Sequence, residues 1–324
     1  MPTKGFFTQG VAVLFRHKIT LASLEPLLSS FKIVKRSEEF EKWEFSGPSF
    51  ILEYRPEVNG YIAVDIVERP WPDQMGDKIN ERMLLGAWAV GQFGPFAFPG
   101  NLERALQHCY WWEEGPKLAP QHQCFVRIRL SYVFGTAQSA PVMPADYKSV
   151  DELNFIIGIV MQLLRHPDAL CYFNPNGELL LERSFMEQVL AHYQKVNLPP
   201  VDLWANRRMF KLKDNWMMMD TVGMRQVDLD DIETCFRSDR FAPNDIAPFL
   251  GNTSLYLLGA GAVIKDGETI DGPGGVLFRA QSFKEGMVTP PRSTLRFRPE
   301  DGTTPPPEFG FNIVEKKKGW QFWK

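Results

Sequence analysis

The chain has 324 residues, of which 44% are hydrophobic and 13% aromatic, so it can bury a sizeable core in one large or two smaller domains. Its formal net charge of −3 lacks the basic excess that is typical of proteins that bind nucleic acids or anionic membranes. The N-terminal apolar run ends at Arg16, and no later run is long enough to span a bilayer, so neither an export signal nor a membrane span is predicted. We therefore expect a cytoplasmic protein, monomeric when free, that binds no nucleic acid or membrane directly.

Short β-rich runs dominate the first 70 residues of the chain. Their apolar and polar residues predict strands over residues 11–16, 31–34, 43–45, 50–54 and 61–67. Thr20 is placed to cap a leucine-rich helix, and Asn59-Gly60 predicts a hairpin turn. These elements indicate an antiparallel sheet with one buried face, while the face that includes Asp65 stays available.

Residues 65–100 resemble neither an ordinary strand nor an ordinary helix, because five glycines and four prolines lie among acids and aromatic residues. Gly and Pro at that density hold turns, and the aromatic residues supply more apolar area than a surface loop exposes. We interpret the segment as a shaped connector that packs Trp88 and the phenylalanines inward and presents Asp73 and Asp77 outward. It is a candidate binding surface, with plain structural packing as the rival interpretation.

A break in composition near Pro116 is interpreted as a domain boundary. The two domains would span residues 1–116 and 117–300, and residues 301–324 would form a tail that docks its aromatic side chains on the body. Asn101 is expected to cap the helix that precedes the boundary.

The second half alternates between the periods of strands and helices. We predict strands over residues 124–134, 169–173, 178–181, 201–212, 216–221, 276–280 and 294–298. We predict helices over residues 150–165, 185–194 and 245–258. Ser149 and Glu152 have the spacing of a capping box, and Gly259 is expected to end the last helix. The fold class is therefore α+β, with two domains that each pack helices on an antiparallel or mixed sheet.

The histidines and cysteines do not have the spacing of a metal site. His108-Cys109 and His122-x-Cys124 match no zinc-finger pattern, and adjacent residues of a helix point about 100° apart. The four scattered cysteines are interpreted as free buried thiols. We expect no metal and no cofactor.

A faint likeness to a restriction-type nuclease motif lies in Pro72-Asp73 and Asp77-Lys78. That motif needs its second acid and its lysine on a strand and separated by one residue, so that both face one metal ion. Here the two residues are adjacent in a loop that contains glycine. We therefore expect no catalytic residues and a protein that is not an enzyme.

The acidic residues are distributed unevenly along the chain. Residues 53–115 carry 10 acidic and 5 basic residues, and residues 214–245 carry 8 acidic and 3 basic residues. Acidic surfaces interleaved with aromatic residues suit a basic protein partner, although ordinary solvated faces would have the same composition. The residues expected to bind a partner are Asp65, Glu68, Trp71, Asp73, Asp77 and Trp88, and secondarily Asp228, Asp230, Asp231 and Glu233. The second run is most simply the solvated start of a helix.

Several stretches of the chain resemble a bacterial family of domains of unknown function. In the second half these are CYFNPNGELL from Cys171, LWANRRMFKL, WMMMDTVGM, NTSLYLLGAGAVIKDGETIDG and STLRFRPEDG. In the first half, YRPEVNGYIAVDIVERPWPDQMGD and MLLGAWAVGQFGPFAFPG resemble longer proteobacterial members, so the likeness extends to about residue 302.

Such longer members look like immunity proteins encoded beside effectors of the type VI secretion system. The resemblance implies a protein that binds and neutralises a cognate effector toxin, such as a nuclease, by covering its active site, and it implies no catalytic residues. Two alternatives stay open. One is a hydrolytic enzyme of unrecognised mechanism, with Asp65, Asp73 and Asp77 near Arg69 and Lys78 in a polar cleft. The other is a scaffold protein of a secretion machine.

Overall fold

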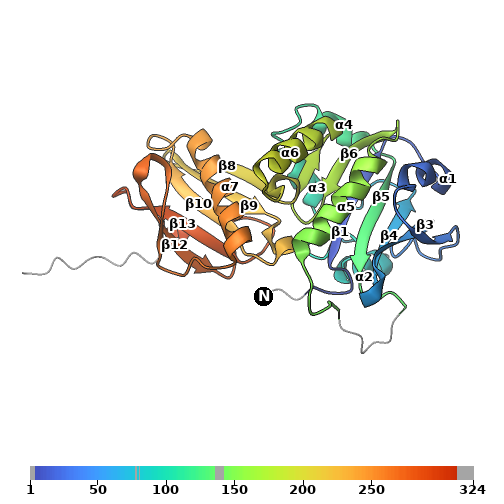
Figure 1. Cartoon of the computed structure of the whole chain (residues 1–324). Coiled ribbons are helices and arrows are strands. Elements are labelled where there is room, and N and C mark those ends of the chain that lie inside the picture. The colour runs from blue at the N-terminus through green and yellow to red at the C-terminus, as the bar shows by residue number, and fades with distance from the viewer. Residues whose placement is uncertain (1–3, 77–78, 80, 136–141, 312–324) are drawn as a thin grey trace, which may run out of the picture.

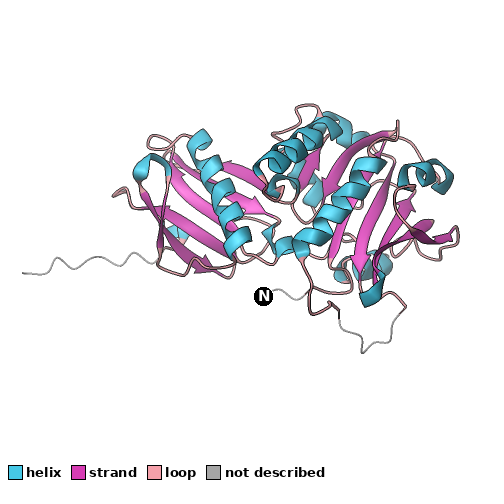
Figure 2. Ribbon diagram, in the orientation of Figure 1, coloured by secondary structure: helices cyan, strands magenta, loops and turns pink. Residues whose placement is uncertain are grey.

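Two β-sheets covered by helices make up the computed structural model, which describes residues 4–76, 79, 81–135 and 142–311 (Figure 1). The fold class is α+β, as the sequence patterns predict. The two sheets lie side by side, each with a long helix across one face (Figure 2). None of the helices in the described ranges combines the length and hydropathy needed to cross a bilayer.

The first sheet has seven strands in the order β2-β3-β4-β5-β1-β6-β7, and every neighbouring pair is antiparallel. The strands are β1 (Gln9–Phe15), β2 (Ile33–Ser37), β3 (Ser49–Arg55), β4 (Gly60–Val67), β5 (Cys124–Ser131), β6 (Ala169–Asn174) and β7 (Leu179–Leu181). Strand β1 lies between β5 and β6 and all seven of its residues are buried. Its successive side chains enter two different hydrophobic clusters, so the sheet is covered on both faces.

The second sheet has six strands in the order β11-β12-β13-β10-β9-β8. They are β8 (Asn206–Lys211), β9 (Trp216–Val222), β10 (Asp231–Arg237), β11 (Thr269–Asp271), β12 (Leu277–Phe283) and β13 (Thr294–Pro299). Strands β10 and β13 pair in parallel and the other neighbours are antiparallel. The second sheet is therefore mixed, which is one of the two forms, antiparallel or mixed, that the sequence predicts.

The described helices are α1 (Leu21–Leu24), α2 (Arg82–Ala89), α3 (Asn101–Gln107), α4 (Gly115–Leu118), α5 (Ser149–Leu163), α6 (Arg183–Val196) and α7 (Pro243–Ala260). Helix α5 lies across the first sheet and α7 across the second (Figure 1). Thr20 caps α1 with a capping box, which confirms the predicted cap. Asn59 adopts a left-handed conformation between β3 and β4, which confirms the predicted turn.

The boundary near Pro116 does not separate the two sheets. Pro116 lies in α4, and β5, β6 and β7 of the first sheet all follow it in the chain. The break in composition there falls at α4, the last α-helix of the long connection between β4 and β5. The chain passes to the second sheet only after α6. One hydrophobic cluster contains residues of both sheets, from Val11 to Phe297, so the core is continuous between them.

Several local expectations are wrong for identifiable reasons. Residues 43–45 form a turn and not a strand. Residues 231–237 form strand β10, where a helix start was expected, because the acids there are paired with arginines from another part of the second sheet. Glu152 caps nothing, since its side chain is buried and faces the N-terminal segment. Gly259 lies inside α7, which ends at Gly261 with a φ of 81°.

The start of the C-terminal tail packs on the second sheet. Phe309 is 1% exposed and packs with Trp216 at a ring-centroid separation of 5.7 Å. The Phe309 carbonyl accepts a hydrogen bond from Arg296 of β13. Residues 312–324 lie outside the described part of the chain.

Two glycines allow the backbones of the two sheets to touch. A Cβ at Gly177, in the turn between β6 and β7, would lie 2.3 Å from the Trp204 carbonyl oxygen, which precedes β8. Gly223, with a φ of 122°, follows β9, and a Cβ there would lie 2.9 Å from the Gly177 Cα. Real Cβ atoms do not approach other heavy atoms this closely, so the junction requires glycine at both positions.

We therefore expect Gly177→Ala to lower the free energy of unfolding by about 2 kcal/mol or more, because the added methyl group meets rigid backbone. Urea unfolding measures this change. Gly259→Ala is the matched control, since Gly259 is an exposed helical residue and a Cβ added there would have no atom within 4 Å. It should stabilise the protein by up to about 1 kcal/mol through helix propensity. Equal effects of the two substitutions would contradict the proposed backbone contact.

Candidate functional site

Asp65, the first acid of the predicted surface, is buried on one face of the first sheet. It is 0% exposed and lies on β4 opposite Arg127 of β5. One carboxylate oxygen lies 2.6 Å from Arg127 Nη2 and the other lies 2.6 Å from Arg129 Nη2. Burial alone raises the pKa of Asp65, but the two guanidinium groups outweigh it and hold that pKa below its ordinary value. Asp65 is therefore a structural ion-pair partner and cannot contact another protein in the folded state.

The aromatic residues of segment 65–100 divide into an inner and an outer set. Trp71, Trp88 and Phe93 are 6%, 6% and 2% exposed and pack together on the face of the first sheet that was expected to be available. The inward prediction is therefore right for Trp88 and Phe93, while Trp71 is buried and does not face a partner. Phe98 is 41% exposed, which corrects the expectation that all the phenylalanines pack inward.

Asp73 has a structural role at the start of α3. Its two carboxylate oxygens accept hydrogen bonds from the backbone N–H groups of Leu102, at 2.7 Å, and Glu103, at 3.0 Å. A carboxylate is favoured there because the first N–H groups of a helix have no partner within the helix. Asp73, which lies 28 residues before Asn101 in the chain, therefore caps α3 in place of the predicted Asn101. The Asn101 side chain instead accepts a hydrogen bond from Trp71 Nε1 at 3.0 Å.

Glu68 and Arg69 do not form a polar cleft with Asp65 and Asp73. Glu68 is exposed and lies 3.2 Å from Lys18. Arg69 lies over the ring of Trp43 at 4.4 Å. Asp77 and Lys78 lie outside the described residues. Among the residues that the structure describes, the acids proposed for a hydrolase are therefore bound to separate groups.

The second acidic run is also partly buried. Asp231 and Glu233 are 1% and 0% exposed on β10, whereas Asp230 is exposed and Asp228 is half-buried. Glu233 lies opposite Arg296 in the parallel β10–β13 pair, with 2.6 Å between a carboxylate oxygen and Nη2. Only Asp228 and Asp230 of this run retain the accessibility that a partner-binding residue needs.

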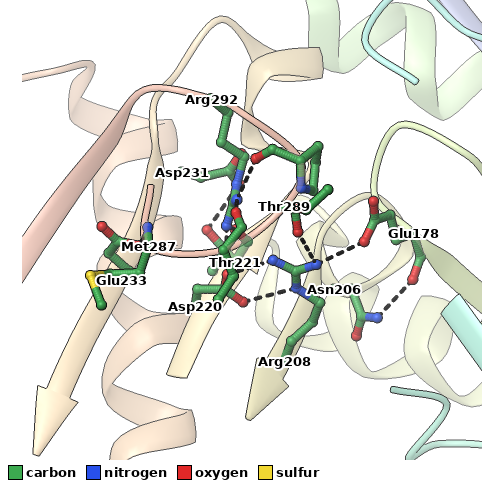
Figure 3. Close-up of polar contacts among 12 residues, drawn as sticks. Glu178, Asn206, Arg208, Asp220, Thr221, Asp231, Glu233, Met287, Thr289 and Arg292 are labelled. Atoms are coloured by element: carbon green, nitrogen blue, oxygen red, sulfur yellow. Dashed lines mark hydrogen bonds and ion pairs between the residues drawn. The ribbon is translucent and has the colours of Figure 1, made fainter. Parts of the chain in front are cut away.

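A buried chain of ion pairs crosses the junction between the sheets (Figure 3). Glu178 follows β6 of the first sheet, and Arg208 and Asp220 lie on β8 and β9 of the second. Arg208 donates to Glu178 at 2.8 Å and binds Asp220 through two nitrogens, at 3.0 and 2.6 Å. This two-pronged geometry is the strongest form of arginine–carboxylate pairing.

The chain of ion pairs continues on both sides of these three residues. Arg292 donates to Asp220 at 2.6 Å, and its Nε lies 3.2 Å from Asp231 (Figure 3). Arg104 of α3 lies 2.6 Å from Glu178. Burial raises the pKa of Glu178, and the arginines around it oppose that rise. Three arginines and three carboxylates thus balance each other across the junction.

We expect Asp220→Asn to lower the free energy of unfolding by about 3–5 kcal/mol, because it leaves the buried Arg208 and Arg292 without their shared counter-charge. Asp239→Asn is the control, since Asp239 pairs with Arg237 at 2.6 Å on the surface, where solvent screens the pair, and should leave stability almost unchanged. Denaturant unfolding of the two variants makes the comparison. Similar losses would show that the buried pairs are not what holds the junction.

A second buried polar cluster ties α5 to the N-terminal segment. Glu152 is 0% exposed and accepts hydrogen bonds from Thr8 Oγ1 at 3.0 Å, Gln9 Nε2 at 3.1 Å and Tyr132 Oη at 2.7 Å. Burial raises the pKa of Glu152 to about 7, and nearby Lys4 only partly opposes that rise.

This raised pKa predicts a pH dependence of stability. In the folded protein Glu152 keeps its proton up to about pH 7, whereas the ordinary value is 4.5. The stability that it contributes is therefore fully present below about pH 4.5 and lost as the pH rises through about 7. Relative to Glu152→Gln, which does not titrate, the wild type should lose up to about 3 kcal/mol of unfolding free energy over that window.

Urea unfolding of the wild type and Glu152→Gln between pH 4.5 and 8 provides the measurement. Asp151→Asn removes a neighbouring exposed charge as a control, and parallel curves for the wild type and Glu152→Gln would contradict the prediction.

A pocket of about 440 Å³ opens above the junction. Its lining comes from residues 95–98 of the glycine-, proline- and aromatic-rich segment, from the turn between β6 and β7, from the β9–β10 connection and from the loop before β13. Besides residues 95–98, the lining residues are Asn176, Val222, Gly223, Arg225, Asp231, Pro290, Pro291 and Arg292. Arg225 lines this junction pocket with its guanidinium over the ring of Phe96 at 5.2 Å. Arg225 and Phe96 were not predicted as site residues.

An exposed surface with aromatic and acidic side chains surrounds α3. We define the α3 surface by Phe98 before the helix, Glu103 on it, and Tyr110, Trp111, Glu113 and Glu114 after it. The aromatic members are 41%, 52% and 43% exposed, in chain order. Trp111 stacks on Phe185 of α6 at 5.4 Å, which holds the indole in place while leaving part of it open to solvent. None of the α3 surface residues was predicted individually to bind a partner, although all of them lie in the acidic range 53–115.

The histidines and cysteines near α3 have structural contacts. His122 Nε2 accepts a hydrogen bond from the Trp71 backbone N–H at 2.8 Å, and His108 lies 3.0 Å from the Tyr110 hydroxyl. Burial lowers the pKa of His108 to about 4. All four cysteines are free thiols. In the described ranges no group of three or more His, Cys, Asp or Glu residues is arranged to hold a metal ion.

Comparison with known proteins identifies one region of similarity. Residues 220–298 match the family model described as "Domain of unknown function (DUF4261)". This range runs from Asp220 in β9 through α7 to β13, and it includes Arg225, Asp231 and Arg292. No curated protein and no solved structure matches the chain.

Proposed function

We propose that this protein is an immunity protein that binds and neutralises a cognate effector toxin of a type VI secretion system, such as a nuclease, by covering its active site. The observation that carries the proposal is the α3 surface, on which three exposed aromatic side chains lie among three exposed glutamates. Aromatic residues are enriched among the residues that dominate the energy of protein interfaces.

Trp111 is the expected anchor of the complex. Its ring is held between Phe185 and Arg207, at 5.4 and 5.7 Å, so little side-chain freedom remains to be lost when a partner covers it. A side chain that is ordered before binding and still 43% exposed can contribute most of its remaining apolar area to the interface.

The glutamates of the α3 surface supply the electrostatic part of recognition. Glu103 and Glu113 make no ion pair among the described residues, and Glu114 pairs only with exposed Lys117, at 3.4 Å. A nuclease active site must be electropositive to hold the phosphate backbone of its substrate. A negative surface is complementary to such a site, so it would speed the encounter and occupy the substrate groove.

The test is co-expression with the secreted effector encoded beside the gene, followed by isothermal titration of the purified partners. Trp111→Ala should weaken binding at least tenfold and abolish protection of cells that express the effector, because it removes the anchor. Trp111→Phe should retain most of the affinity. Both variants should keep the thermal stability of the wild type within a few degrees, which separates lost contact from lost folding.

Charge provides a second measurement on the same complex. Replacement of Glu103, Glu113 and Glu114 by glutamine should slow association and flatten its dependence on salt concentration. Replacement of Glu39 and Glu41 by glutamine is the control, since these exposed acids lie between β2 and β3, near the far edge of the first sheet. A complex whose affinity and salt dependence survive both sets of α3 variants would refute this surface. Self-association on sizing without any heterocomplex would favour a scaffold protein.

A further inference from the structure

The junction pocket contains a cation that the described part of the chain leaves unneutralised. Arg225 forms no ion pair with a described carboxylate, and its buried Nε has no hydrogen-bond acceptor. Its position over the Phe96 ring offers a cation–π contact, which is weaker than pairing with an anion. In a protein whose other buried arginines bind carboxylates, this leaves one guanidinium able to bind an external anion.

The neighbouring arginine of the pocket is already neutralised. Arg292 is 4% exposed and binds both Asp220 and Asp231, at 2.6 and 3.2 Å. Its remaining nitrogen donates to the backbone carbonyls of Val288 and Pro290. The pocket therefore offers one uncompensated positive charge, at Arg225. A single guanidinium balances the one negative charge of a carboxylate and matches its planar, two-oxygen geometry, whereas it would leave one charge of a phosphate dianion unbalanced.

The rest of the pocket lining is suited to an apolar body. Phe96 and Phe98 come from the segment before α3, and Pro290 and Pro291 come from the loop before β13. The volume of about 440 Å³ is within the range of sites that bind small molecules. An apolar group among these side chains would be close to the cation that binds its carboxylate.

From this arrangement we infer that the junction pocket binds a small monocarboxylate with an aromatic or aliphatic body, through an ion pair between the carboxylate and Arg225. Phe98 is the one residue that lines the junction pocket and also belongs to the α3 surface as defined above. The two sites are otherwise made of different residues. Occupancy would also add contacts across the junction, because the lining combines the segment before α3 with the β9–β10 connection and the loop before β13.

The inference is tested on the full chain by two-dimensional nitrogen NMR, with phenylacetate as the probe. Saturable shifts are expected at the Gly223 amide and the Arg225 side-chain N–H. Phenylacetamide, which has the same shape without the charge, and inorganic phosphate should each bind at least tenfold more weakly. Arg225→Gln should reduce phenylacetate affinity at least tenfold, whereas Arg240→Gln, at an exposed arginine after β10, should leave it unchanged.

A second variant keeps the test decisive if Arg225→Gln proves unstable. Phe98→Ala removes an exposed ring at the rim and should weaken phenylacetate binding several-fold without altering the fold. The inference is overturned if phenylacetamide binds as well as phenylacetate, if phosphate binds equally tightly, or if no probe gives saturable shifts. Unchanged phenylacetate affinity in both pocket variants would also overturn it. None of these results depends on whether an effector binds the α3 surface, so the two proposals can fail separately.

Discussion

The pairing of buried arginines with buried carboxylates is the constraint on which the rest of the structure depends. A charge that leaves water must be compensated nearby, and the angular demands of a two-pronged pair allow little movement. At the junction, Glu178 belongs to the first sheet and Arg208 to the second, so their ion pair fixes how the sheets meet. Arg104 binds the same Glu178 from α3. The orientation of α3, and with it the α3 surface, thus depends on the same carboxylate as the junction.

The segment over residues 65–100 connects these features in sequence order. Trp71 and Trp88 cover one face of the first sheet, Asp73 supplies the cap of α3, and Phe96 and Phe98 form a wall of the junction pocket. The segment needs its glycines and prolines because each role requires a change of chain direction. The two interpretations of the segment therefore hold for different residues. Trp71, Trp88 and Phe93 pack inside the protein, whereas Phe98 is at the surface.

The sequence was sufficient to predict most strands and helices, because alternation and helical spacing report local burial. It could not place Asp65 on the inner or outer face. The alternating pattern shows that Asp65 differs from its neighbours but not that its face is covered. The cover comes from α2 and α3, which follow later in the chain, and from residues 44–47, which are bonded to Asp65 and its two arginines. The same limit applies to Glu233, whose partner Arg296 is brought beside it by a parallel pairing of distant strands. Charged residues that alternate with apolar ones, as in DIETCFR and TLRFRP, were the available signal for buried pairs between these strands.

The number of acidic residues in a stretch of the chain therefore does not give the charge that the stretch presents at the surface. Of the acids between residues 53 and 115, Asp65 is neutralised internally and Asp73 is bound to helix N–H groups, whereas Glu103, Glu113 and Glu114 are exposed. The region that matches the family model supplies Arg225 and Arg292 to the junction pocket, but residues 95–98 of the lining precede that region. A chain with the same matched region and a different preceding segment would keep the cation and lose the aromatic wall. The N-terminal part of this chain thus supplies the aromatic part of the pocket lining, while the matched region supplies its cation together with Pro290 and Pro291.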